Sequence, residues 1–261
     1  MHPLALEVRQ HGTADENRSH ILAALALGLP ELQPALCAHD GTFVIVGSGP
    51  SLPQFVEEIK GEREKGRPIC AIKGTHDFLC ERGIEPTLFL SVDPRPRVEH
   101  LRCKTENTIY LIASRCHPEI FQRLKGDRII LWHSWADEDE AREIWETRKQ
   151  KLLIGGGTTS GLRAINVAYL LGFRKFVLYG MDSCLGSDGT KRFNGDLPGQ
   201  TIDVFVGGPT GRKFLTNHAM AQQASDFQQV YNAMPDVTVE ARGDGLLAAI
   251  IEERKQRGMK A

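Results

Sequence analysis

The chain of 261 residues carries 32 Lys and Arg against 33 Asp and Glu, for a net charge of −1, and 41% of its residues are hydrophobic. This length suits one large domain or two small ones, and it buries a sizeable core without disulfides or metals. The balanced charge excludes a protein that coats nucleic acid or an anionic membrane, and no stretch approaches the roughly 20 apolar residues of a membrane span. We therefore expect small-molecule partners, with no nucleic acid and no membrane.

The start of the chain and the cysteines indicate a cytoplasmic protein. The apolar run 21–27 has neither a basic lead-in nor a small-residue cleavage site, so it does not resemble a signal peptide. The chain has 6 cysteines and no C-x-x-C pair, which argues against a structural zinc site. Reduced thiols, with Cys70 as a small buried residue, are the simplest expectation.

Apolar runs rich in β-branched and aromatic residues alternate with segments of helical spacing. Helices are expected at 14–28, 54–59, around 78–80, and at 137–150, 158–171, 217–232 and 245–257. Strands are expected at 42–46, 68–72, 87–92, 108–113, 128–132, 175–179 and 237–239. Continuous apolar strands that alternate with helices predict an α/β fold, Rossmann-like and doubly wound, with a mainly parallel sheet and helices on both faces.

The domain organisation follows from the same pattern. We expect residues 1–40 to form an N-terminal helical segment and residues 41–261 to form the Rossmann-like domain. Within this domain, 185–215 is rich in Gly, Asp, Asn and Pro and has weak periodicity. Connections of this length are usually functional or disordered. We therefore expect a long loop or a β-rich insertion over the functional edge of the sheet.

Glycine is enriched, with 26 residues or roughly 10% of the chain against an average near 7%, and it gathers at strand-to-helix turns. The turn after the first expected strand consists of Gly47, Ser48, Gly49, Pro50, Ser51 and Leu52. Ligands of open parallel sheets bind beyond the carboxyl ends of the strands, where a glycine turn lets the backbone approach an anion. The turn is not a P-loop, and Leu52 replaces the third glycine of a dinucleotide fingerprint. Nucleotide binding and simple tight packing are both compatible with it.

Two more turns bring glycine and hydroxyl groups to the same expected edge. Their residues are Gly74, Thr75, Gly157, Thr158, Thr159 and Ser160. Free backbone N–H groups and hydroxyls at the start of a helix suit a phosphate or another anion. The alternative for the second turn is a flexible loop in which a threonine caps the helix. Several such turns on one sheet favour a nucleotide ligand.

Asp93 and Asp182 each follow an apolar strand, where a carboxylate can hold a hard cation such as Mg²⁺ between substrate phosphates. The alternative is an aspartate that stabilises a turn. Arg95 lies in a loop stiffened by two prolines and suits a phosphate clamp. We predict Asp93, Arg95 and Asp182 as catalytic residues, with the two aspartates as the metal ligands.

Three histidines, His76, His117 and His133, also lie near strand ends. Histidine is the side chain best suited to acid–base chemistry near neutral pH. A lone histidine at a strand end is more often structural, so both interpretations are kept.

Taken in order, the motifs resemble those of the 6-hydroxymethylpterin diphosphokinase MptE-like family. The motifs are Gly47-Ser48-Gly49-Pro50-Ser51-Leu52, Ala71-Ile72-Lys73-Gly74-Thr75, Gly83-Ile84-Glu85-Pro86, Val92-Asp93-Pro94, Gly156-Gly157-Thr158-Thr159-Ser160-Gly161 and Tyr179-Gly180-Met181-Asp182. The resemblance covers about residues 15–250 and implies a Rossmann-like domain. It also implies diphosphate transfer from ATP to a pterin with a divalent metal, a nucleotide site at 47–52, and family aspartates at Asp93 and Asp182.

Some relatives of this family are central domains of flagellin-glycosylation factors that look similar to bacterial sialyltransferases. The archaeal enzymes carry further acidic residues in the three motifs that correspond to 91–94, 112–117 and 159–162 of this chain. Three functions are therefore weighed. The first is a metal-dependent transferase of the diphosphokinase type that uses ATP. The others are a sialyltransferase-like glycosyltransferase with a nucleotide-sugar donor and a non-catalytic nucleotide-binding module.

Overall fold

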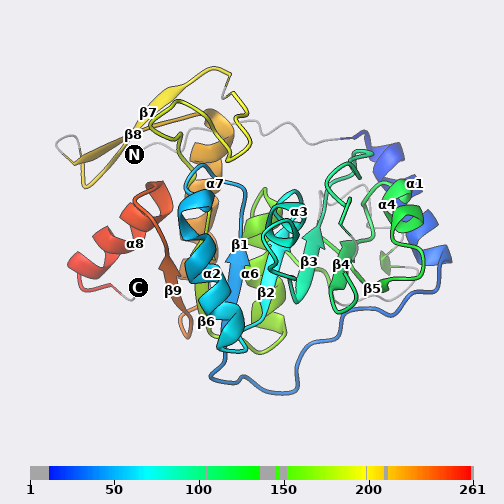
Figure 1. The fold of residues 1–261 in the computed structure, drawn as a ribbon. Helices are drawn as coiled ribbons and strands as arrows, with labels where there is room; N and C mark the ends of the chain where they lie inside the picture. Colours follow the sequence, from blue (N-terminus) through cyan, green and yellow to red (C-terminus); the bar gives the residue numbers. More distant parts are fainter. Residues whose placement is uncertain are drawn as a thin grey trace.

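The computed structural model describes residues 12–103, 105–135, 145–146, 152–197, 199–208 and 211–259. Its centre is a sheet of seven parallel strands in the order β5-β4-β3-β2-β1-β6-β9 (Figure 1). The strands are β1 (Thr42–Val46), β2 (Ile69–Ile72), β3 (Leu88–Ser91), β4 (Ile109–Ala113), β5 (Arg128–Trp132), β6 (Lys175–Tyr179) and β9 (Thr238–Ala241). The predicted α/β, Rossmann-like parallel sheet is confirmed.

The helices cover this sheet and follow the expected spacing, with one addition. They are α1 (Ala14–Ala26), η1 (Leu52–Phe55), α2 (Val56–Glu64), α3 (Thr75–Cys80), α4 (Pro118–Arg123), α6 (Ser160–Leu170), α7 (His218–Asn232) and α8 (Leu246–Gln256). The short helix α4 was not predicted, because its Pro118 and His117 read as loop residues although they form its first turn and its N-cap. Most of the predicted helix at 137–150 lies outside the described residues.

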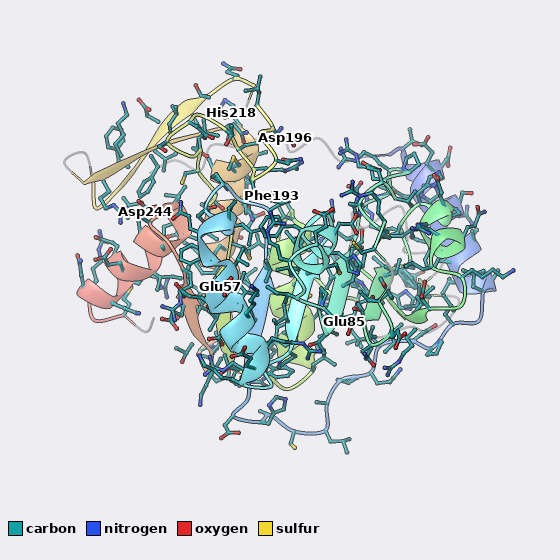
Figure 2. All side chains as sticks on the ribbon, viewed as in Figure 1. Glu57, Glu85, Phe193, Asp196, His218 and Asp244 are labelled. Atoms are coloured by element: carbon teal, nitrogen blue, oxygen red, sulfur yellow. The ribbon has the colours of Figure 1, made fainter. Side chains whose placement is uncertain are left out.

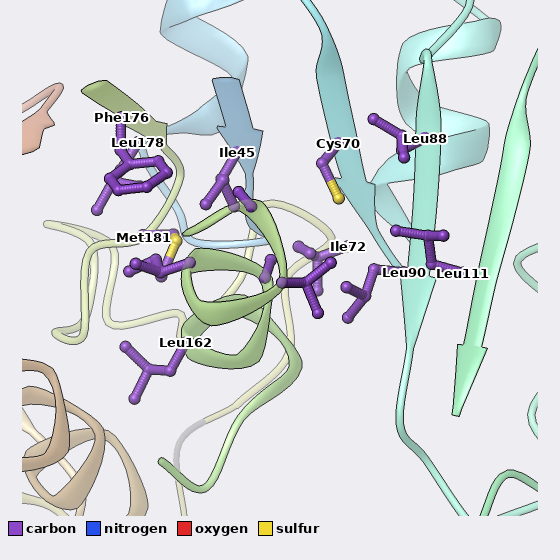
Figure 3. Packing of buried hydrophobic residues seen from close by; sticks show 14 of the residues in the cluster. Ile45, Cys70, Ile72, Leu88, Leu90, Leu111, Leu162, Phe176, Leu178 and Met181 are labelled. Carbon is purple, nitrogen blue, oxygen red and sulfur yellow. The ribbon is translucent and has the colours of Figure 1, made fainter. Parts of the chain in front are cut away.

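The core has two layers, one on each face of the sheet. In β1, Phe43 and Ile45 pack on one face, whereas Val44 and Val46 pack on the other. Figure 3 shows part of the first face, to which Leu162 of α6 and Met181 belong together with strand residues such as Ile45 and Leu90. The second face is covered by the η1–α2 segment and α3. Because both faces are covered, the strands are apolar throughout rather than alternating, as expected for a parallel sheet.

The strand order reverses at β1. Strands β2 to β5 follow on one side of β1, and β6 and β9 follow on the other. Ligands of doubly wound sheets bind at such a switch point, beyond the carboxyl ends of the strands. The turns at 47–52 and 180–182, which follow β1 and β6, meet at this point.

The insertion at 185–215 ends in an antiparallel hairpin of β7 (Ile202–Val206) and β8 (Arg212–Thr216). The insertion therefore contains both a loop and a β-hairpin, which were the two expected alternatives. Figure 2 labels Phe193, Asp196 and His218 at one end of the molecule. The ring centroids of Phe193 and Phe78 lie 4.6 Å apart, and the backbone N–H of Phe193 donates to the carbonyl oxygen of Ser48 at 3.1 Å. The insertion thus contacts the first glycine turn.

The N-terminal segment packs on the other end of the sheet. A capping box of Thr13 and Glu16 begins α1, which lies beside α4 (Figure 1). Residues 30–32 run along β5: the Leu32 N–H donates to Leu131, and the Leu131 N–H donates to Pro30, both at 2.8 Å. Trp145 is buried against Ile21. Each helix in the described part is too short or too polar to cross a membrane.

Candidate functional site

The first glycine turn is packed directly against the turn that follows β6. The Gly47 N–H donates to Tyr179 at 2.8 Å, and the Gly49 N–H donates to Gly180 at 2.7 Å. A Cβ atom on Gly47 would lie 2.6 Å from the Gly180 oxygen, and one on Gly49 would lie 2.1 Å from a carboxylate oxygen of Asp182. Such distances are far below van der Waals contact, so the two glycines are required for this packing whatever else the turn binds.

Asp182 holds the two turns together. Its carboxylate accepts hydrogen bonds from the Ser51 N–H at 3.1 Å and the Ser51 hydroxyl at 2.7 Å. Asp182 is only 4% exposed. Burial raises the pKa of Asp182, and the two hydrogen bonds from Ser51 offset this only in part. The geometry is that of an aspartate that stabilises a turn, which is one of the two roles weighed above.

Asp93 has a different environment, in which two cations share its carboxylate. Lys73 Nζ lies 2.7 Å from Oδ2, and the Arg95 guanidinium donates from Nε at 2.8 Å and from Nη2 at 2.7 Å. The Arg95 N–H adds a fourth hydrogen bond at 3.2 Å. We call these three residues the Lys73–Asp93–Arg95 cluster. Burial alone would raise the pKa of Asp93, but the hydrogen bonds from Arg95 and the charge of Lys73 hold it well below its usual range.

The cluster carries one more positive than negative charge and reaches solvent. The Lys73 and Arg95 side chains are 31% and 33% exposed, whereas that of Asp93 is 5% exposed. An ammonium has three N–H donors and a guanidinium has five, and Asp93 uses only some of them. Lys73 is also held in the left-handed region, with φ of 52°. This conformation is uncommon for a residue with a side chain, and it marks a backbone position fixed by its surroundings.

The other predicted nucleotide-binding residues are mostly engaged within the protein. The Thr75 hydroxyl donates to Val46 at 2.9 Å and ties α3 to β1, and Leu52 is fully buried. Gly74 has open space where a Cβ would lie, with only His100 nearby at 3.8 Å. Around the first turn, Ser48 and Pro50 keep partial exposure. Nucleotide binding by these residues stays a prediction.

The turn before α6 is fixed by α7. Thr158 donates from its N–H and its hydroxyl to Asp226 Oδ2, both at 3.0 Å. Thr159 is the N-cap of α6, as the alternative interpretation expected, and it accepts the Leu162 N–H. Gly157 has a φ of 86°, which only glycine adopts without strain. Ser160 is 4% exposed, and its hydroxyl has no hydrogen-bond partner within the described part of the chain.

The three histidines have structural contacts. His76 is buried, and burial lowers its pKa despite the neighbouring Asp77. His117 accepts the Glu119 N–H at 3.3 Å as the N-cap of α4. His133 Nδ1 lies 3.1 Å from the Ser114 hydroxyl. Each contact explains the histidine without a substrate, so an acid–base role stays a prediction.

The residues as placed do not fit a magnesium site. The structure engages Asp93 with two cations and Asp182 with Ser51, and no contact joins the two aspartates. Among the described residues, no three His, Cys, Asp or Glu side chains come together as metal ligands would. A cation at Asp93 would have to displace Lys73 and Arg95. The role of Mg²⁺ therefore stays a prediction that requires a rearrangement of this cluster.

Two participants were missing from the predicted site. Lys73 lies in the Ala71–Thr75 motif, so its position after a strand was an available signal. Asp226 binds Thr158 across 68 positions of sequence, and nothing in its local pattern indicates this contact. The structure thus adds a lysine to the predicted Asp93 and Arg95, and it assigns Asp182 to the first glycine turn.

The comparisons with known proteins agree with this fold. The model of the 6-hydroxymethylpterin diphosphokinase MptE-like family matches residues 23–188. The chain is similar to the Maf glycosyltransferase from Magnetospirillum magneticum AMB-1, with a TM-score of 0.65 and 14% identity over 97% of this chain and 43% of that one. It is less similar to a mammalian sialyltransferase, with a TM-score of 0.43 and 12% identity over 90% of this chain and 82% of that one. No curated protein gives a significant match. The chain thus spans less than half of the glycosyltransferase.

Proposed function

Because the chain belongs to the 6-hydroxymethylpterin diphosphokinase MptE-like family, we propose that it is a transferase whose donor is linked to a nucleotide. We propose further that the transferred group is a sugar. The observation that carries this proposal is the Lys73–Asp93–Arg95 cluster, which presents an excess of positive charge at the carboxyl edge of the sheet. The predicted nucleotide turns lie at the ends of the neighbouring strands.

The chemistry of sugar transfer suits such a cluster. The bond between the anomeric carbon and a phosphate oxygen of the donor breaks, and a bond to an acceptor oxygen forms while a base takes up the acceptor proton. Negative charge then accumulates on the departing phosphate. Fixed cations near that phosphate stabilise the charge without reorganisation. Lys73 and Arg95 are held in place by Asp93, and each keeps donors that this carboxylate does not use.

Two further observations support a sugar as the transferred group. The similarity to the Maf glycosyltransferase extends over 97% of this chain, so it includes the insertion that contacts the first glycine turn. In addition, Asp93 is neutralised by protein cations, which agrees better with charge stabilisation by side chains than with a metal held by aspartates.

Diphosphate transfer from ATP with Mg²⁺ is the second candidate, and the description of the matching family favours it. In that case Asp93 would exchange its two cations for the metal, and Lys73 and Arg95 would turn to the phosphates. Positioning and electrostatic stabilisation carry most of the catalysis in phosphoryl-type transfer, so these residues would keep a role. The two candidates differ in their need for a metal and in the donor that they bind.

Thermal unfolding with added ligands separates the candidates. We expect CMP- or UDP-linked sugars to raise the melting temperature in the presence of a chelator, because a ligand at about 100 times its Kd stabilises the folded state by about 2.7 kcal/mol. Lys73→Gln and Arg95→Gln should each reduce this stabilisation. Release of free nucleotide from the same donors, measured with wild-type protein, then tests turnover.

Lys60→Gln is the matched control, because Lys60 pairs with an exposed glutamate on α2 and lies away from the cluster. Its response to the donors should equal that of the wild type. Stabilisation by ATP with Mg²⁺, abolished by the chelator and absent with every nucleotide sugar, would replace the first candidate by the second. Binding without any turnover would leave a nucleotide-binding module.

A further inference from the structure

Two arginines lie close together at the carboxyl edge, on elements that neighbour the strands of the Lys73–Asp93–Arg95 cluster. Arg115 follows β4, and Arg163 is in the first turns of α6. Backbone hydrogen bonds connect the two segments. The Ser114 N–H donates to the carbonyl oxygen of Trp132, the last residue of β5, at 2.8 Å. The Ile154 N–H donates to the carbonyl oxygen of His133, the following residue, also at 2.8 Å. Arg163 Nη1 in turn donates to the Ile154 carbonyl.

Neither arginine has a carboxylate to neutralise it. Arg163 donates to two carbonyl oxygens, those of Gly157 and Ile154, and Arg115 donates to the side-chain oxygen of Asn17 at 3.3 Å. Within the part of the chain that the structure describes, neither guanidinium forms an ion pair, whereas Arg95 has one with Asp93. Burial and the nearby charge of Arg115 lower the pKa of Arg163 to about 10. The charge of Asp226 offsets this lowering only in part. Two positive charges without an ion pair therefore repel each other here.

Unpaired polar atoms surround the same place. Arg115 Nε and the hydroxyls of Ser134 and Ser160 are buried with no hydrogen-bond partner among the described residues. Ser134 and Ser160 are 5% and 4% exposed. Ser160 lies three positions before Arg163, on the same face of α6, and Ser134 pairs with Ile154 in an isolated bridge. A buried polar group without a partner costs about 1–3 kcal/mol, so three of them in one place require an explanation.

We propose that Arg115 and Arg163 bind an oxyanion, a carboxylate or a phosphate of a ligand, with the hydroxyls of Ser134 and Ser160 as additional donors. A guanidinium presents its N–H groups in a fork that matches both kinds of oxyanion, and a negative charge between the two arginines removes their repulsion. The site uses other residues than the Lys73–Asp93–Arg95 cluster, and the proposal does not depend on which group the protein transfers. A ligand with two anionic groups, or two anionic ligands, would occupy both places.

The test measures thermal unfolding with sodium pyrophosphate and with sodium malonate, against sodium chloride at equal ionic strength. We expect at least one of these oxyanions to raise the melting temperature beyond the chloride control. Arg115→Gln should weaken the apparent affinity by about tenfold or more, since it removes hydrogen bonds to a charged group. A response to pyrophosphate alone assigns a phosphate site, and a response to malonate alone assigns a carboxylate site.

Matched variants decide whether the response belongs to this site. Lys73→Gln should keep the component that Arg115→Gln loses, and Arg257→Gln, in the exposed last part of the chain, should behave as the wild type. Without anion, Arg115→Gln should melt no lower than the wild type, because the repulsion is relieved. If that variant does not fold, Arg115→Lys replaces it and should bind with intermediate affinity. No response to either oxyanion, or an equal response in the Arg115 variant, would overturn the proposal.

Discussion

The ends of β1 and β6 differ sharply from the ends of β2 and β3, although all four lie on the same edge of one sheet. At β1 and β6, two turns are packed so closely that Gly49 leaves no room for a Cβ atom, and Asp182 is buried under Ser51. At β2 and β3, the Lys73–Asp93–Arg95 cluster is charged and its two cations are about one-third exposed. The turns after β1 and β6 are therefore tightly packed, whereas the cluster after β2 and β3 presents charged side chains to solvent.

A sequence motif can therefore be explained by packing or by a ligand. The glycines after β1 are required for packing against the neighbouring turn, whether or not they also bind a ligand. The charged residues after β2 and β3 compensate one another only in part, and the remaining charge is available to an anion. The two aspartates, which looked alike in the sequence, therefore have opposite roles.

Gly49→Ala should have the largest effect of the changes considered. Its Cβ would lie 2.1 Å from the Asp182 carboxylate and 2.7 Å from the Gly180 oxygen, and both belong to a well-packed turn. We expect a loss of about 3 kcal/mol or more in the free energy of unfolding, because overpacking of this kind forces the backbone to shift. Denaturant unfolding followed by circular dichroism measures it.

Gly61→Ala is the control for that change, since Gly61 lies inside α2 and no atom comes within 4 Å of its added Cβ. It should stabilise the protein by about 0.5–1 kcal/mol, the usual gain from replacing a glycine in a helix. Equal stability of the Gly49 variant and the wild type would show that the two turns are not packed as described.

Asp93→Asn should have an intermediate effect. It leaves Lys73 and Arg95 side by side without a carboxylate, and we expect a loss of about 2 kcal/mol at neutral pH. The folded-state pKa of Asp93 is lowered, so its stabilisation is complete above the unfolded pKa of about 4 and is lost as the pH falls toward the folded value. The difference in free energy between wild type and variant should therefore shrink in acid. A difference that stays constant down to about pH 2 would contradict the ion pairs.

Asp182→Asn should have the smallest effect and the opposite dependence on pH. Burial raises the folded-state pKa of Asp182, so the charged form costs stability that the neutral form does not. The wild type should lose stability relative to the variant as the pH rises above the ordinary pKa of about 4. At neutral pH the net change should be under about 1 kcal/mol, because an amide can still pair with Ser51. If the stability difference from the wild type changed with pH in the same direction for both aspartate variants, the predicted opposite behaviour would be wrong.

The fold was largely predictable because its signal is local. All seven sheet strands fall within two residues of the expected positions, since buried parallel strands are continuous apolar runs. The predicted end of α1 is two residues too late, because the periodic pattern continues to Gly28 whereas the helix ends at Ala26. The helix α4 was missed because its first turn and its N-cap, Pro118 and His117, are residue types that are common in loops.

The site was predictable only in part, because its contacts are not local. Asp93 and Arg95 are two positions apart, and the sequence indicated both. Lys73 reaches Asp93 from 20 positions away, and only the pairing of β2 with β3 brings them together. The same holds for Ser51 and Asp182, which are 131 positions apart in the turns after the neighbouring strands β1 and β6. Strand order, which composition and spacing do not determine, decides which polar residues meet.

The short segment that runs along β5 has a consequence for how this protein avoids association with its own copies. An edge strand of a sheet presents unpaired N–H and C=O groups, on which another chain can add a strand. At Leu131, residues Pro30 and Leu32 satisfy both groups from within the molecule. The segment thus covers part of this edge strand, and its removal would expose backbone groups on which another copy of the chain could add a strand.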